Sequence, residues 1–139
     1  MSIADINIDG LVGTITLTNP AKHNVLSAAL VDHIVAGLRR MKSEKVRAAV
    51  LRAPKGVRVW SAGHDVSELP ESGRDPLGWD DPLRHLVREI EEFPAPVLTM
   101  VEGSVWGGAC ELVFSSDLIV AAPDATFAVT HDDHRREAE

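Results

Sequence analysis

The 139-residue sequence predicts an α/β fold built on a parallel sheet. Three observations favour this class. Short apolar runs of strand length recur along the chain, segments with apolar residues at helical spacing lie between them, and glycine-containing turns follow several of the runs. Strand, helix and strand in this order are typical of crossovers onto a parallel sheet. The length suits one domain with its own core.

The N-terminal segment predicts a β-hairpin. Residues 3–8 and 11–17 each alternate apolar and polar side chains, and Asp9-Gly10 lies between them. Asp-Gly between two alternating runs is a strong signal for a tight turn with positive φ angles. Asn19-Pro20 then ends the second strand.

The first helix is expected to begin after Ser27, a typical N-cap residue. Its apolar residues recur at helical spacing: Leu30, Ile34, Leu38 and Met41. Residues 46–51 form an apolar, partly β-branched run and predict a buried strand. A short strand is expected over residues 57–60, followed by a mobile loop over residues 71–80.

The second helix is expected to begin at Asp81-Pro82, a cap residue followed by a first-turn proline. Its apolar face is formed by Leu83, Leu86, Val87 and Ile90. The remaining elements follow in sequence: a buried strand over residues 97–101, a short helix over 109–116, and strands over 118–122 and 126–129. Residues 131–139 contain one apolar residue and are expected to be a disordered charged tail, so the folded domain is residues 1–130.

Composition excludes several classes of function. The formal net charge is −7, which argues against nucleic-acid binding. No apolar run approaches the length of a membrane span, so no membrane association is expected. Cys110 is the single cysteine, which rules out an internal disulfide and suits a reducing cytoplasm.

Two glycine-containing turns are the candidate site. Residues 62–66 and 107–111 each follow a predicted strand. If neighbouring parallel strands carry both turns, their N–H groups can converge on one oxygen and form an oxyanion hole. The alternative is that each is a tight turn packed in the core.

The motifs around these turns resemble the crotonase (enoyl-CoA hydratase/isomerase) superfamily. The resemblance rests on Trp60-Ser61-Ala62-Gly63-His64-Asp65, on residues 101–112, which contain Val105-Trp106-Gly107-Gly108-Ala109, and on Ser116-Asp117. It implies a crotonase-type ββα spiral core, truncated before the C-terminal helical region. Family members are about twice as long, and the end of this chain looks foreign, frame-shifted or truncated.

The resemblance also implies roles for particular residues. The N–H groups of His64 and Gly108 would form an oxyanion hole for the carbonyl of an acyl-CoA thioester. Thr130 would lie near the acyl group, and four residues would line the coenzyme A groove: Ala62, Gly63, Asp65 and Val66. No metal and no separate cofactor are expected, since coenzyme A is part of the substrate.

The implied reaction is decarboxylation of methylmalonyl-CoA or malonyl-CoA through a thioester enolate, whose charge the two N–H groups stabilise. Two alternatives remain open. Glu111 lies where hydratases carry one of their two acid/base carboxylates, which favours an enoyl-CoA hydratase or isomerase, although Glu111 could simply complement a helix N-terminus. The chain could also be an inactive fragment or subunit, because the tyrosine that would hold the substrate carboxylate is absent.

Two further expectations concern packing and assembly. Trp106 could border the acyl pocket or pack in the core. By resemblance, the completed fold would assemble into a homo-oligomer, a trimer or a hexamer. Apolar surface left uncovered by the missing half would favour association or aggregation.

Overall fold

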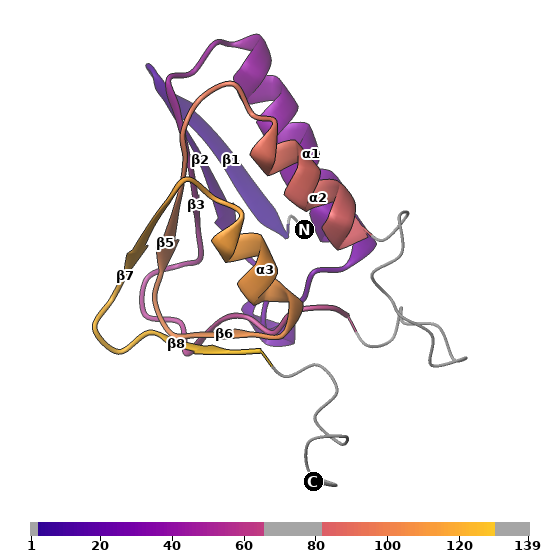
Figure 1. Cartoon of the computed structure of the whole chain (residues 1–139), viewed down its shortest axis with the longest axis vertical. Coiled ribbons are helices and arrows are strands. Elements are labelled where there is room, and N and C mark those ends of the chain that lie inside the picture. Colours follow the sequence, from indigo (N-terminus) through magenta and orange to yellow (C-terminus); the bar gives the residue numbers. More distant parts are fainter. Residues whose placement is uncertain (1–2, 66–81, 130–139) are drawn as a thin grey trace, which may run out of the picture.

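The computed structural model describes residues 3–65 and 82–129 and contains a five-stranded sheet of order β1-β2-β3-β5-β7 (Figure 1). The strands are β1 (Ala4–Asp9), β2 (Val12–Leu17), β3 (Ala48–Arg52), β5 (Val97–Val101) and β7 (Leu118–Ala121). β1 and β2 pair antiparallel, and the other neighbours pair parallel. The predicted hairpin is confirmed: Asp9 pairs with Val12, and Gly10 in the turn has φ +62°.

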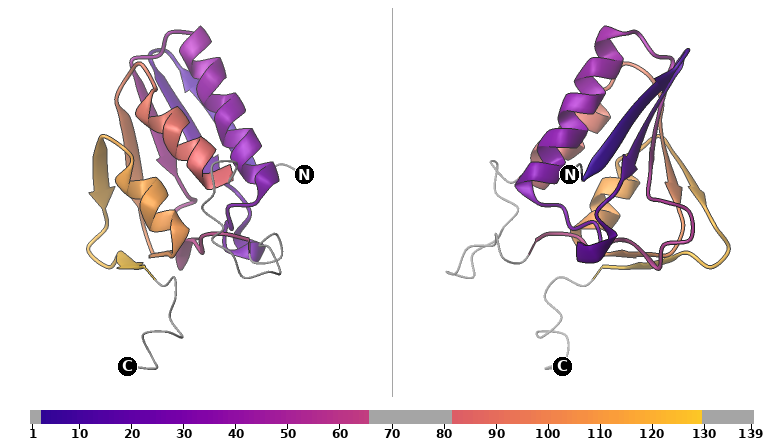
Figure 2. Two further views of the ribbon diagram at one scale, coloured as in Figure 1. Left: turned by 45° about the vertical axis from the view of Figure 1, so that its right-hand side comes forward. Right: turned by 180° about the vertical axis from the view of Figure 1, so that it is seen from behind.

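Two helices, α1 (Ala28–Ser43) and α2 (Pro82–Glu91), lie side by side on one face of this sheet (Figures 1 and 2). The predicted cap of α1 is confirmed, because the Ser27 Oγ accepts a hydrogen bond of 3.1 Å from the N–H of Leu30. The apolar faces of both helices are buried against the sheet and each other.

A second sheet was not predicted. It has the order β4-β6-β8 and consists of β4 (Val59–Ser61), β6 (Ser104–Trp106) and β8 (Thr126–Ala128), all parallel. β6 had no signal in the sequence because, of its three side chains, only that of Val105 is buried. The third helix, α3 (Gly108–Phe114), directly follows β6 and packs against β6 and α2. Figure 1 shows this sheet along the base of the molecule.

The chain winds through both sheets as a spiral of ββα units. β3, β4 and α2 form one unit, and β5, β6 and α3 form the next, while β7 and β8 begin a third. Each unit adds one parallel strand to each sheet. This is the ββα spiral of the crotonase-type fold that the resemblance implied.

The core lies between the large sheet, the helices and the small sheet. Trp60 at its centre is fully buried, and its Nε1–H donates to the Met100 carbonyl oxygen at 2.8 Å. No helix of the described residues is long and apolar enough to cross a membrane. The predicted loop at 71–80 and tail at 131–139 lie outside the described residues, as do the candidate residues Val66 and Thr130.

Candidate functional site

The two glycine-containing turns lie against each other. They follow β4 and β6, which are neighbouring parallel strands, so both turns leave the same edge of the small sheet. A β-carbon built on Gly63 would lie 2.7 Å from the Trp106 carbonyl oxygen and 3.1 Å from the amide nitrogen of Gly108. The structure therefore brings together the backbone of the two turns that the sequence singled out.

Both turns require glycine. Gly63 has φ +89°, and Gly107 has φ 56° and ψ −128°, conformations that L-amino acids rarely adopt. Each of these glycines directly precedes a predicted N–H donor, His64 after Gly63 and Gly108 after Gly107. Among the described residues, nothing accepts a hydrogen bond from the N–H of Gly108, which is the first residue of α3.

The neighbouring N–H groups of the first turn are already used within the fold. The Ala62 N–H donates to the His23 carbonyl oxygen at 2.9 Å. The Gly63 N–H donates to the Ser61 Oγ at 3.3 Å. These two N–H groups therefore help to hold the backbone of the first turn in place.

The His64 side chain also lies against the second turn. A β-carbon on Gly108 would lie 2.8 Å from the His64 Nδ1 and 2.9 Å from the Leu83 Cδ2. His64 is half-buried, and its backbone forms a parallel bridge with Leu26. The imidazole thus packs over Gly108, and any larger residue there would displace it.

A buried asparagine holds the first turn in place, and sequence reasoning missed it. Asn24 is fully buried with φ +49°, and its Nδ2 donates to the Trp60 carbonyl oxygen at 3.0 Å. Its Oδ1 accepts from the Asn19 N–H at 2.7 Å. No distinct signal in the sequence marks it, because Asn24 is the last of three polar residues, Lys22-His23-Asn24, before the apolar pair Val25-Leu26.

Two further contacts tie this segment to the turn. The Ser61 Oγ donates to the Asn24 carbonyl oxygen at 2.8 Å, and the Leu26 N–H donates to the Gly63 carbonyl oxygen at 2.7 Å. Residues 19–26 therefore clamp the turn that carries His64. Buried and fully paired polar networks of this kind fix a single backbone geometry.

The remaining candidate side chains lie around α3. Glu111 is in its first turn and is exposed, three residues after Gly108. Cys110 is buried in the core, and this burial raises the pKa of its thiol. Trp106 is 37% exposed and meets the His23 ring edge-on with centroids 6.1 Å apart, so it is not a core residue.

A hollow of about 450 Å³ reaches the end of β6 through Trp106. Its lining residues are Gly56, Val57, Arg58, Val59, Glu102, Gly103, Ser104, Trp106 and Asp124. This hollow therefore adjoins the strand that leads into the second turn. Asp65 of the first turn is half-buried and does not line it.

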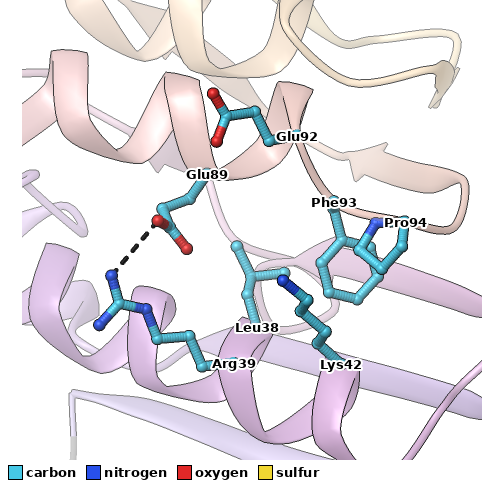
Figure 3. Close-up of a pocket in the computed structure, with 7 residues that line it drawn as sticks. All are labelled: Leu38, Arg39, Lys42, Glu89, Glu92, Phe93 and Pro94. Carbon is cyan, nitrogen blue, oxygen red and sulfur yellow. Dashed lines mark hydrogen bonds and ion pairs between the residues drawn. The ribbon is translucent and has the colours of Figure 1, made fainter.

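A second hollow, of about 290 Å³, lies between α1 and α2 (Figure 3). It is lined by Leu38, Arg39, Lys42, Glu89, Glu92, Phe93 and Pro94, and an ion pair of 3.3 Å joins Arg39 to Glu89. It sits at the C-terminal end of α2, whereas Leu83 near the N-terminal end contacts Gly108. A ten-residue helix is about 15 Å long, so this hollow is separate from the two turns.

Within residues 3–65 and 82–129, no group of three or more His, Cys, Asp and Glu side chains is placed to hold a metal ion. The site is instead a backbone site. Its described parts are two glycine-bearing turns, a packed imidazole and the buried segment that supports the first turn.

Comparison with known proteins agrees with this architecture. The enoyl-CoA hydratase/isomerase family model matches residues 7–132. Methylmalonyl-CoA decarboxylase of Escherichia coli is 50% identical over 119 residues, which are 86% of this chain and 46% of that protein. Human mitochondrial enoyl-CoA hydratase domain-containing protein 3 is 32% identical over 123 residues, covering 87% of this chain and 40% of that protein.

A solved structure of methylmalonyl-CoA decarboxylase in complex with 2-nitronate-propionyl-CoA superposes with a TM-score of 0.89 at 46% identity. The superposition covers 93% of this chain and 50% of that one. The chain thus spans about half the length of the relatives it matches. Sequence, fold and the order of the two turns all agree, and the chain belongs to the enoyl-CoA hydratase/isomerase (crotonase) family.

Proposed function

We propose that this chain supplies the oxyanion hole of an acyl-CoA decarboxylase acting on methylmalonyl-CoA or malonyl-CoA. The donors are the N–H groups of His64 and Gly108. The observation that supports the proposal is the close approach of the two turns, since a β-carbon built on Gly63 would lie 3.1 Å from the Gly108 amide nitrogen. The similarity to methylmalonyl-CoA decarboxylase supports the choice of reaction.

The chemistry needs little more than these two dipoles. Cleavage of the carbon–carbon bond releases CO2 and leaves its electron pair on the thioester as an enolate, with the charge on the former carbonyl oxygen. The enolate carbon then takes up a proton. Fixed N–H donors stabilise the oxygen as its charge develops, and removing one such donor typically lowers kcat about 10²–10³-fold.

Coenzyme A contacts are proposed for Ala62, Gly63 and Asp65, with Val66 and Thr130 as further candidates outside the described residues. The N–H groups of Ala62 and Gly63 are bonded within the fold, so contacts from these two residues do not use them. Assembly into a trimer or hexamer and a cytoplasmic location stay predictions.

The direct test compares two variants at one position. The chain, alone and together with the second half of the E. coli enzyme, is incubated with methylmalonyl-CoA and malonyl-CoA, and released CO2 is measured. His64→Ala keeps the backbone N–H and should retain most activity, whereas His64→Pro removes it and should lose about 10²–10³-fold. Circular dichroism of both variants checks that they fold.

Two results would overturn the proposal. One is that neither preparation consumes thioester and calorimetry detects no binding of 2-nitronate-propionyl-CoA, the ligand in the solved relative. The other is equal loss of activity in both His64 variants, which would assign the role to the imidazole.

A second candidate function is enoyl-CoA hydration using Glu111. The observation in its favour is that the exposed Glu111 lies in the first turn of α3, three residues after Gly108. Glu111→Gln should then abolish hydration of crotonyl-CoA while leaving binding intact. The hydratase alternative is rejected if the unmodified chain does not hydrate crotonyl-CoA and Glu111→Gln leaves decarboxylation unchanged. An inactive subunit is the outcome if neither reaction occurs and folding is intact.

A further inference from the structure

Each of the two sheets ends in an edge strand to which a further unit of the spiral could pair. In the described residues, β7 is the last strand of the large sheet and β8 is the last strand of the small one. The first two units each end in a helix, α2 or α3. The described part of the chain ends at Val129, directly after β8, so the third unit has its two strands and no helix among the described residues.

The side chains at these edges are apolar and exposed. Every residue of β7 is exposed, whereas alternate residues of its neighbour β5 are buried. We define the β7/β8 edge as Phe114, Leu118, Ile119, Val120, Phe127 and Val129, which are between 39% and 58% exposed. Phe114 and Phe127 stack at 5.7 Å, which joins the end of α3 to the small sheet as one apolar surface.

The opposite edge of the large sheet is built differently. β1 exposes Asp5, Asn7 and Asp9 in alternation, while Ala4 is buried and Ile6 and Ile8 are partly buried. Charged and polar side chains are the usual protection of an edge strand that stays solvent-facing. A strand with Leu118, Ile119 and Val120 all exposed lacks that protection, which is typical of a surface that another segment covers.

We propose that the β7/β8 edge is the docking surface for the second half of a crotonase-family chain. The family match runs to residue 132, a few residues beyond β8, and the aligned residues cover 46% of the E. coli relative and 50% of the solved chain. A further ββα unit would add one strand parallel to β7 and one parallel to β8, as the two earlier units did. Its helix would cover the Phe114–Phe127 pair.

A second copy of this chain fits the edge less well. Two copies related by a two-fold axis would pair β7 with β7 antiparallel, which breaks the parallel order of β3, β5 and β7. Each copy also carries a formal net charge of −7, which opposes self-association. The inference concerns assembly and holds independently of the proposed reaction.

The test co-expresses the full chain with a tagged segment comprising the second half of E. coli methylmalonyl-CoA decarboxylase. A 1:1 complex is expected by size-exclusion chromatography with light scattering. Leu118→Lys should weaken it at least tenfold. Leu11→Lys is the matched control, because Leu11 is 59% exposed against 58% for Leu118 and lies in the β1–β2 turn. The control should leave binding unchanged.

A fusion keeps the proposal falsifiable if the separate segment fails to fold. Here the same E. coli segment is joined directly after Val129, and binding of an apolar dye and hydrogen exchange of the β7 amides are measured. Both should fall severalfold relative to the unfused chain. Unchanged dye binding and exchange in the fusion, a complex insensitive to Leu118→Lys, or a homodimer that Leu118→Lys dissociates would each overturn the proposal.

These outcomes are separate from those that test the reaction. A specific complex without decarboxylation would contradict the proposed function and leave the docking surface supported. Decarboxylation by the chain alone, with no complex, would support the proposed function and contradict the docking surface.

Discussion

Gly63 and Gly108 approach each other so closely that a β-carbon at Gly63 would lie 3.1 Å from the Gly108 amide nitrogen. The two residues are 45 positions apart and belong to different turns of the spiral. The parallel pairing of β4 with β6 brings them together. The small sheet therefore holds the two glycine-bearing turns next to each other.

Gly63→Ala should destabilise the fold more than Gly56→Ala. Both glycines have similar positive φ angles, +89° and +84°, so the backbone strain is comparable. A β-carbon at Gly56 meets nothing within 4 Å, whereas one at Gly63 meets the Trp106 carbonyl oxygen at 2.7 Å. The free energy of unfolding from urea titrations should fall by about 1–3 kcal/mol more for Gly63→Ala. Equal losses would mean that the two turns are not in contact.

Asn24→Ala should be strongly destabilising. The substitution leaves the Trp60 carbonyl oxygen and the Asn19 N–H without their buried partner, at a cost of about 1–3 kcal/mol each. Asn7→Ala, at an exposed position on β1, is the control and should change the unfolding free energy by less than about 0.5 kcal/mol. A similar small effect at both positions would show that Asn24 does not clamp the first turn.

Thr99→Val should stabilise the chain by about 1 kcal/mol. Thr99 on β5 is fully buried, and its Oγ1 has no hydrogen-bond partner among the described residues. Valine has the same shape without the hydroxyl to desolvate. The control is Thr126→Val, where the Oγ1 is exposed and lies 2.8 Å from the Ser104 Oγ. A rise in the urea midpoint is expected only for Thr99→Val, and a fall would reveal a partner for this hydroxyl.

The Cys110 thiol should make stability depend on pH in the alkaline range. Burial raises its pKa in the folded state, and the backbone hydrogen bond at Ala128 offsets part of the rise. Because the folded pKa is the higher one, this contribution is complete below the unfolded pKa of about 8.5 and is lost as pH rises through the folded value. The unfolding free energy of the unmodified chain should therefore fall relative to that of Cys110→Ala as the pH rises above about 8.5. If the unfolding free energies of the two proteins changed with pH in parallel, this prediction would be contradicted.

Local signals in the sequence predicted the hairpin, the helices and the strands of the large sheet. Ser27 and the spacing of Leu30 to Met41 determine α1 without help from distant residues. The small sheet could not be predicted in this way, because β6 buries only Val105 and owes its place to pairing with β4 and β8.

The candidate site likewise has parts that local sequence signals predict and parts that depend on contacts between distant segments. The two glycine-bearing turns were found from their residue types and their position after strands. Their contact depends on β4 and β6 being neighbours, a relationship between segments far apart in the chain. Asn24 was missed because its role exists only once residues 19–26 fold against Trp60 and Gly63.

The most direct test of the paired donors is the backbone amide spectrum of the ¹⁵N-labelled chain, alone or fused after Val129, titrated with a nitronate analogue of the thioester. The N–H resonances of both His64 and Gly108 should move downfield together, since each donates to the anionic oxygen, while the resonance of Gly56 stays in place. Movement of only one of the two, or of neither at saturating ligand, would contradict the account.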